Sequence, residues 1–331
     1  PDILSFSSCI AQSAIRNTLD NLPRKTKERS TKSKEGEGTL SVQTLDMKPV
    51  CEFLIPGLYV ENDSRMDIIL DNKGMFEGSL TSELIAYNDN YLKSLNGKLF
   101  SADSTFTVLI DAAAIESGSL SMTSPSLIAK AEDNIISLNY RFDNEGREAS
   151  RADLNAMVSF PNRNESAYTL LLHILPSETT IRGKDWSLNP SSIYFKDKTL
   201  QINGFGLTSG EQAMTIDGKL TDRKTDTLNF VLNDFDIGIL NPFITKPLDI
   251  QGRFTGKGRA YALFGEEKGI LLDLKGDNLS IYGHDAGTMN ILSKWDENKE
   301  QLNILIDNKL EERSPLNIVG SWDPSTSRLD L

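Results

Sequence analysis

The stretch that decides the fold is LDMKPVCEFL, residues 45–54, because a stretch of the same design, FDIGILNPFI, returns at residues 235–244. The match continues in register beyond both stretches, and an alternating apolar run precedes each copy. What recurs is mainly the type of residue at each position. The identical pairs are Asp46/Asp236, Phe53/Phe243 and Leu58/Leu248. We interpret the two copies as a sequence repeat.

Each copy predicts a strand, a helical turn and a second strand. Asp46 and Asp236 stand where a carboxylate can accept hydrogen bonds from the free N–H groups at the start of a helical turn, so they are the predicted caps. An isolated turn of helix is marginal in water, and each turn must therefore dock its apolar residues on the sheet beside it. We expect both turns to plug or cover an end of that sheet.

Short alternating segments, separated by Gly, Asn, Asp and Ser, fill nearly all of the chain after Gly38. Such segments at about ten-residue spacing, with no helices between them, are typical of all-β proteins. Because apolar residues recur at every second position, one face of each strand is predicted to be apolar and the other polar. The clearest segments are residues 66–70, 76–80, 106–110, 136–142, 154–160, 168–174, 192–195, 200–203, 214–220, 270–274, 279–281, 289–291, 302–306 and 316–322.

The sequence predicts four regions. Residues 1–22 carry apolar side chains at helical spacing before Pro23 and are predicted to be a helix. Residues 23–37 are a basic polar linker, which either contacts anionic lipid headgroups or is simply solvated. Residues 38–229 form the first β repeat unit, and residues 230–331 form a second, truncated one. Both ends of the chain look cut, so we expect a segment of a longer protein.

Composition narrows the function classes. A formal net charge of −12 over 331 residues argues against nucleic-acid binding, which needs a concentrated basic face. No window approaches the roughly 18 apolar residues of a membrane span. The two cysteines, Cys9 and Cys51, allow one disulfide in an oxidising compartment; alternatively, Cys51 is a small buried hydrophobe on the apolar side of the repeated turn.

No pattern in the sequence is typical of catalysis or of a metal site. His173 and His284 are the only histidines, whereas a zinc site usually needs several closely arranged N or S ligands. The glycines of residues 252–258 lack the spacing of a dinucleotide fingerprint, and residues 206–210 are interpreted as a turn. No two acids stand out as an acid–base couple. We therefore expect no enzyme activity, no cofactor and no metal.

The predicted sheet has one apolar face and no helices to cover it, so that face must be buried in another way. Two sheets packed as a sandwich would close a dry core. An elongated repetitive sheet folded into a trough would instead leave an apolar channel for a lipid. A strand of about 5–6 residues is about 17–20 Å long, similar to the ~15 Å hydrocarbon depth of one bilayer leaflet. Alternation alone does not choose between the two.

Residues 181–205 and 214–218 resemble the TamB branch of the AsmA-like bacterial envelope proteins. The resemblance covers residues 38–331, is best after residue 176, and rests on strand and turn motifs. The motifs that follow in the same order are DTL at 226–228, NDFDI at 233–237, LNPF at 240–243, LDIQG at 248–252, GTMNI at 287–291 and VGSWDP at 319–324.

This resemblance implies a non-enzymatic periplasmic segment of a longer protein anchored in the inner membrane, with a β-taco-like groove. Members of the family are implicated in moving phospholipids toward the outer membrane or in outer-membrane protein assembly. The implied partners are a phospholipid or another acyl-chain lipid and, through another part of the longer protein, an outer-membrane barrel protein. The alternative is a structural or adhesion module of closed β-sandwiches without a lipid groove.

Alternation also selects candidate residues for the lining of a lipid groove. In this hypothesis no residue reacts, and selectivity comes only from the apolar lining. The candidates are Ile193, Phe195, Leu200, Ile202, Met214, Ile216, Leu272, Leu274, Leu279, Ile281, Met289, Ile291, Leu302, Ile304 and Ile306.

Overall fold

The structure of the chain is a computed structural model. It describes residues 37–71, 75–102, 104–118, 120–144, 149–161, 169–243, 249–265, 268–296, 299, 301–309, 316–323 and 328–330. The predicted N-terminal helix, nearly all of the predicted linker and Cys9 lie outside the described residues. Cys51 is buried.

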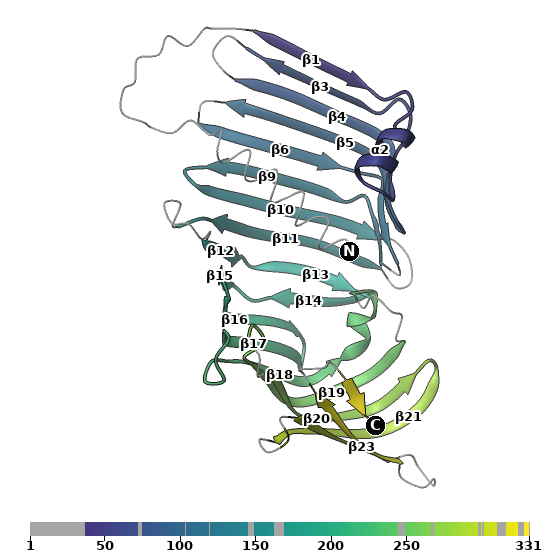
Figure 1. Ribbon diagram of the computed structural model, residues 1–331, viewed down its shortest axis with the longest axis vertical. Helices are drawn as coiled ribbons and strands as arrows, with labels where there is room; N and C mark the ends of the chain where they lie inside the picture. Colours follow the sequence, from purple (N-terminus) through teal and green to yellow (C-terminus); the bar gives the residue numbers. More distant parts are fainter. Residues whose placement is uncertain are drawn as a thin grey trace. The chain divides into compact units, whose positions relative to one another are not determined.

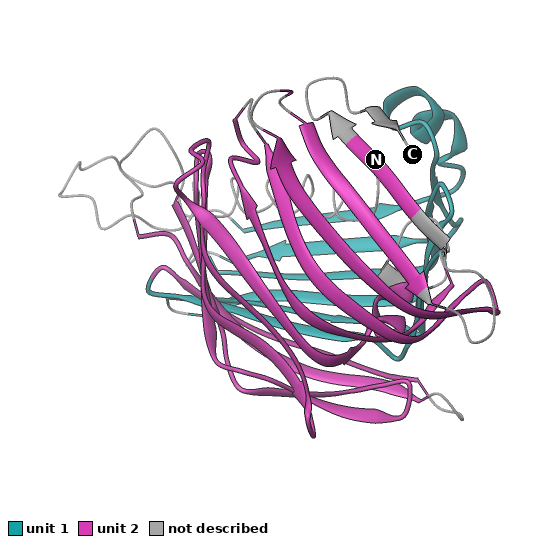
Figure 2. Ribbon diagram, turned by 90° about the horizontal axis from the view of Figure 1, so that it is seen from below, with its two compact units in different colours: residues 1–133 teal, residues 134–331 magenta. Residues whose placement is uncertain are grey.

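The described residues are almost entirely in antiparallel β-strands, which confirms the predicted all-β class (Figure 1). Every one of the clearest alternating segments falls on a strand. The chain divides into two compact units, Pro1–Asp133 and Asn134–Leu331 (Figure 2). The proposed boundary between the two repeat copies, at residues 229 and 230, falls instead inside a strand, so the copies do not coincide with the compact units.

The first unit is a sheet in the order β1–β3–β4–β5–β6–β9. Short strands extend it at one end, where β2 pairs with β4, β7 with β5, and β8 with β7. The elements are β1 (Gly38–Gln43), α2 (Lys48–Leu54), β2 (Leu58–Val60), β3 (Arg65–Leu70), β4 (Phe76–Tyr87), β5 (Asn90–Ala102), β6 (Thr105–Asp111), β7 (Ala114–Ser117), β8 (Leu120–Thr123) and β9 (Ser126–Glu132).

The second unit begins with the pair β10–β11, after which the sheet divides between β12–β15 and β13–β14 and rejoins at β16. From β16 to β24 the strands follow one another as an antiparallel meander. The elements are β10 (Ile135–Asn144), β11 (Ser150–Ser159), β12 (Thr169–Ile174), β13 (Ser177–Ile181), β14 (Lys184–Leu188), β15 (Ser191–Lys196), β16 (Thr199–Ser209), β17 (Gln212–Leu220), β18 (Thr227–Asp236), η1 (Ile237–Phe243), β19 (Ile250–Tyr261), β20 (Gly269–Ile281), β21 (His284–Asp296), β22 (Gln301–Lys309), β23 (Leu316–Asp323) and β24 (Arg328–Asp330).

Two hairpins of the second unit close through two residues with positive φ, as in type I′ turns. Arg182 and Gly183 (φ 52° and 74°) join β13 to β14, and Tyr282 and Gly283 (φ 51° and 74°) join β20 to β21. The interpretation of residues 206–210 as a turn was wrong, because β16 continues to Ser209. The pairing of β16 with β17 extends its strand through this segment.

Both copies of the repeated stretch contain a seven-residue helical segment after a strand, α2 in one and η1 in the other. The two aspartates make the same contact: the N–H of Lys48 donates to Asp46 Oδ1 at 3.0 Å, and the N–H of Gly238 donates to Asp236 Oδ1 at 2.9 Å. Asp236 directly precedes η1, whereas the N-cap of α2 is Met47, without a side-chain cap hydrogen bond, so the predicted cap at Asp46 was wrong by one residue. Neither helical segment of the described chain has the length and apolar character that a bilayer crossing requires.

The two helical segments differ in how they are covered. In η1, Ile239 is buried, and Ile237 and Leu240 pack against the core of the second unit, so the predicted docking is confirmed there. In α2 only Cys51 is buried, while Phe53 and Leu54 are 84% and 67% exposed. The prediction that both segments cover their apolar residues is therefore wrong for α2, where Phe53 and Leu54 stay exposed.

Candidate functional site

One face of the meander in the second unit carries rows of apolar side chains in register. We call it the plug face, because η1 packs on it beside the buried core of this unit. Directly opposed residues in neighbouring antiparallel strands share a face. The first row crosses β17 to β23 and consists of Met214, Leu232, Gly256, Leu274, Ile291, Ile306 and Ile318.

A second row lies two residues along each strand, again on the plug face. It consists of Ile216, Phe230, Gly258, Leu272, Ser293, Ile304 and Gly320. Ser293 interrupts it, with its hydroxyl bonded to the backbone of Leu272 and Ile270. The backbone of β15 to β17 places Ile193, Phe195, Leu200 and Ile202 on the same face, where Ile202 opposes Gly218 and Leu200 opposes Leu220.

The remaining candidates join this face with one exception. Leu302 shares the face of Ile304 on β22, Met289 opposes Gly276 beside the first row, and Leu279 belongs to the buried core. Ile281 opposes Ile250 at the β20–β21 hairpin, beyond irregularities in the register, and is not brought into the rows. The alternation of the sequence thus assigned the face correctly across most of the meander.

The side chains of the plug face are neither fully buried nor fully exposed to solvent. Of the candidate residues, Leu279 and Leu302 are buried, Phe195 is 42% exposed, and the others are half-buried. Alternate positions such as Asp217, Lys275 and Asn303 are exposed on the opposite face. All described strands of this unit belong to one hydrogen-bonded sheet, so the apolar side chains are not buried against a separate second sheet as they would be in a sandwich.

The sheet of the second unit is bent along its strands (Figure 2). Bulges interrupt the register after Ile202, Leu232, Gln251 and Gly276, and bulges bend a strand and increase its twist. Glycine in β19 allows close packing at the bend, where the Phe230 ring and Leu272 Cδ2 lie over Gly258. Curvature of the face therefore comes from local irregularity in the strands.

Replacement of Gly256 by alanine is expected to lower the free energy of unfolding of the second unit by about 1–3 kcal/mol. Gly256 has φ +142°, and a Cβ there would lie 2.9 Å from the Cα of Leu274, which is backbone and cannot rotate away. Urea unfolding measures the loss. Gly97→Ala, on β5 of the first unit, is the control for the substitution itself and is measured on that unit, since its Cβ would have no neighbour closer than 3.5 Å. Equal losses in the two variants would contradict the bend.

A buried core closes part of the plug face next to η1. Trp186 and Phe235 are 1% and 0% exposed, and their rings meet edge to face with centroids 5.5 Å apart. Ile239 of η1 and Leu279 of β20 complete the contact from two other elements. This core holds η1 on the sheet.

Sequence reasoning missed several residues of this face. Phe230 and Leu232 lie in the run noted only as the strand before the repeated turn, and Phe254 is hidden among the glycines of residues 252–258. Alternation within β18 could have found the first two. It also misled in one respect, because the opposite face of β21 to β23 has an exposed apolar row. Its members are Leu292, Leu305 and Val319.

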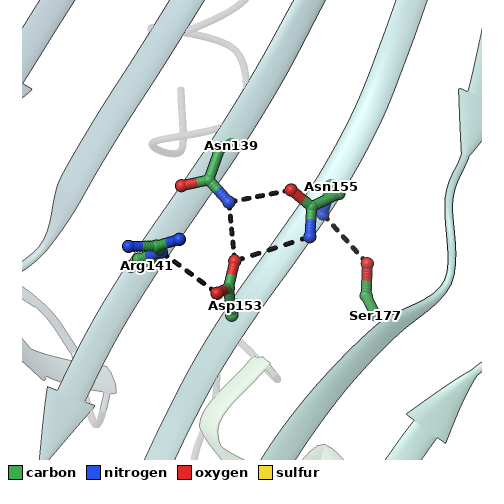
Figure 3. A network of polar contacts seen from close by, with 5 residues as sticks. All are labelled: Asn139, Arg141, Asp153, Asn155 and Ser177. Atoms are coloured by element: carbon green, nitrogen blue, oxygen red, sulfur yellow. Dashed lines mark hydrogen bonds and ion pairs between the residues drawn. The ribbon is translucent and has the colours of Figure 1, made fainter.

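A second candidate is the polar network on β10, β11 and β13 (Figure 3). Asn139 Nδ2 donates to Asp153 Oδ1 at 2.6 Å and to Asn155 Oδ1 at 2.9 Å, and Arg141 Nε lies 3.1 Å from Asp153 Oδ2. The N–H of Asn155 donates to Ser177 Oγ at 2.9 Å. Because these bonds link neighbouring strands, the network holds the three strands in register.

The Asp153 carboxylate has a pKa below its ordinary value. Desolvation is the largest single influence and acts to raise the pKa, but hydrogen bonds from Asn139, Arg141 and Asn155, with the charge of Arg141, together outweigh it. A folded-state pKa below the unfolded one means that the ionised carboxylate stabilises the fold. That stabilisation is present above the unfolded pKa and is lost as the pH falls through the folded one.

Asp153→Asn is therefore expected to remove part of the acid sensitivity of the second unit. The effect is below about 1 kcal/mol, since the side chain is half exposed. Thermal unfolding between neutral pH and about pH 3 should show that the variant and the wild type converge as the pH falls. Glu211→Gln, in the exposed β16–β17 turn, is the control. Parallel pH curves for wild type and D153N would argue against this role.

Within the described parts of the chain, no group of three or more His, Cys, Asp or Glu side chains is arranged to hold a metal ion. His173 lies on β12 opposite Met157 and Ser192, and His284 begins β21 after the hairpin turn. The comparisons with known proteins add no assignment: no family model, no curated protein and no solved structure matches this chain.

Proposed function

We propose that this chain is a non-enzymatic lipid-handling segment in which the plug face of the second unit shields the acyl chains of a phospholipid. The observation that carries the proposal is the pair of apolar rows across β17 to β23, in which most side chains are half-buried and Leu232 is buried. Contact with a hydrocarbon chain removes such apolar surface from water, and this burial lowers the free energy of the system.

The dimensions of the rows support this proposal. Neighbouring strands lie about 4.8 Å apart, so a row across seven strands runs roughly 29 Å. The hydrocarbon depth of one bilayer leaflet is ~15 Å, so one row is longer than an extended acyl chain needs. The rows offer methyl and methylene groups and no charge, which fits binding without selectivity for a particular acyl chain.

The resemblance to the TamB branch of the AsmA-like proteins supports the same function and extends it. Under this proposal the chain works in the periplasm, as part of a longer protein anchored in the inner membrane. Its partner is a phospholipid in transit between the inner and outer membranes, and an outer-membrane barrel protein contacts another part of the longer protein.

Site-specific photo-crosslinking tests the proposal. A photoreactive amino acid at Ile202 or Ile304, both on the plug face, should form phospholipid adducts in cells. The same amino acid at Gln201 or Asn303, one residue earlier in each strand, is the matched control and should not. Adducts confined to the control positions, or absent from all four, would contradict the proposal.

A structural or adhesion module is the second candidate, and the buried core around Trp186, Phe235 and Ile239 favours it, because that core closes part of the face by itself. Native mass spectrometry of the purified chain separates the two candidates. A lipid-handling segment retains bound lipid or detergent, whereas a self-sealed module has a single mass equal to that of the polypeptide.

A further inference from the structure

A cavity of about 360 Å³ lies beside η1, where the plug face ends. Three cationic side chains from separate parts of the sheet line it: Arg182 from the β13–β14 turn, Lys184 from β14 and Arg253 from β19. The remaining lining is Ile181, Asp236, Ile239, Gln251, Gly252 and Asn278. The volume of the cavity is at the low end of the range of about 300–1,000 Å³ for small-molecule sites.

The lining of this cavity carries more cations than carboxylates, as does a second cavity lined by Lys257, Arg259 and Lys294 with Asp273. The whole chain has 47 acidic and 35 basic residues, yet the lining has three cations and one carboxylate. That carboxylate, Asp236, already accepts the N–H of Gly238 as the cap of η1. Asp234, which pairs with Arg253, is a second carboxylate beside the cavity, so the cations exceed the carboxylates by one and an anion entering it would meet a weakly positive potential.

The positions of the cations are constrained by the fold. Arg182 lies in the left-handed conformation at the tip of its hairpin, with Nη1 3.1 Å from where a Cβ on Gly238 would be. Lys184 Nζ lies 5.3 Å from the centre of the buried Trp186 ring. Arg253 Nη1 pairs with Asp234 Oδ2 at 2.6 Å. A guanidinium has five N–H donors, so one ion pair does not use all of them.

The cavity also borders the apolar core. Ile181 and Ile239, two of its lining residues, pack in the cluster around Trp186 and Phe235. Arginine forks, an ammonium group and side-chain amides are the donors that bind phosphate oxygens. A site with such donors next to an apolar face matches a molecule with a phosphate at one end and hydrocarbon at the other.

We infer that this cavity binds a phosphate group. Within the function proposed above, on which the identity of the ligand rests, this is the phosphate of a phospholipid headgroup. The acyl chains of that phospholipid lie along the plug face. Inorganic phosphate shares the same chemistry and is the second source of the anion. Arg182, Lys184 and Arg253 bind the oxygens, and no covalent step occurs.

Isothermal titration of the full chain tests the inference with two probes, inorganic phosphate and dihexanoylphosphatidylglycerol below its micelle concentration. The variant R182Q/K184Q should bind both probes about ten-fold more weakly than wild type or worse, since charge-assisted hydrogen bonds are lost. K98Q/K198Q, with the same charge change on exposed positions that line neither cavity, should change binding less than about two-fold. Circular dichroism checks folding, and R253Q is the second variant.

The outcomes separate the cavity from the lipid function. Binding of phosphate alone, lost in R182Q/K184Q, supports the anion site and overturns the lipid as its ligand. Binding of the phospholipid with equal affinity in wild type and R182Q/K184Q overturns the cavity and leaves the apolar face standing. Absence of binding of both probes overturns both proposals. Weakening in K98Q/K198Q equal to that in R182Q/K184Q means that only net charge matters and overturns the cavity as the site.

Discussion

Phe235→Ala is expected to lower the free energy of unfolding of the second unit by about 3–5 kcal/mol. Phe235 is fully buried, packs edge to face on Trp186 and lies two residues before the start of η1. Its removal leaves a cavity that the surrounding sheet cannot fill, and η1 loses the surface on which it docks. Urea unfolding followed by tryptophan fluorescence measures the loss, because Trp186 lies within the same core.

Phe53→Ala is the control with the same change of side chain, since Phe53 lies in α2, the helical segment of the other copy, and is 84% exposed. Its replacement should change stability by less than about 0.5 kcal/mol. A loss of several kcal/mol in F53A would mean that α2 is covered in solution. A loss below about 1 kcal/mol in F235A would contradict a core built around η1.

Ile304→Glu is expected to reduce the phospholipid that copurifies with the chain by at least about ten-fold. Ile304 is half-buried in the second apolar row, between Ser293 and Gly320 on neighbouring strands. A carboxylate there must be desolvated when an acyl chain covers the row, and no cation is available among the apolar residues of the two rows to compensate. Quantitative lipid mass spectrometry of the purified proteins measures the effect.

Leu305→Glu changes the same chemistry at the next residue of β22. Leu305 is 41% exposed on the opposite face, so this variant should retain its lipid. Both variants add one carboxylate to β22, so a difference in lipid content between them reports the face that carries the charge. Equal lipid content in I304E and L305E would refute the plug face as the binding surface, provided that both variants unfold at the same urea concentration as wild type.

The contrast between α2 and η1 shows which features of the fold the local sequence predicts and which it does not. Both segments follow a strand, and at the start of each an aspartate accepts the N–H two residues later. These contacts are local and were predictable from Asp46 and Asp236. Burial of the apolar residues was not, because it depends on Trp186 and Leu279, which reach η1 from strands distant in sequence.

The cationic cavity illustrates the same limit. Arg182, Lys184 and Arg253 stand at no motif spacing, and Arg253 is separated from the other two by four intervening strands. No pattern in the sequence indicates that they share a site. They meet because the β13–β14 hairpin and β19 both contact the segment around η1.

The sequence by itself determined that the chain is built of antiparallel strands, where most of them lie, and which side chains share a face, because the pleat of a strand imposes a period of two on every residue. Only the folded chain shows which strands are neighbours, where bulges and Gly256 or Gly258 bend the sheet, and that η1 rather than α2 is covered. Those outcomes depend on contacts between residues far apart in the chain, and alternation carries no information about distance along it.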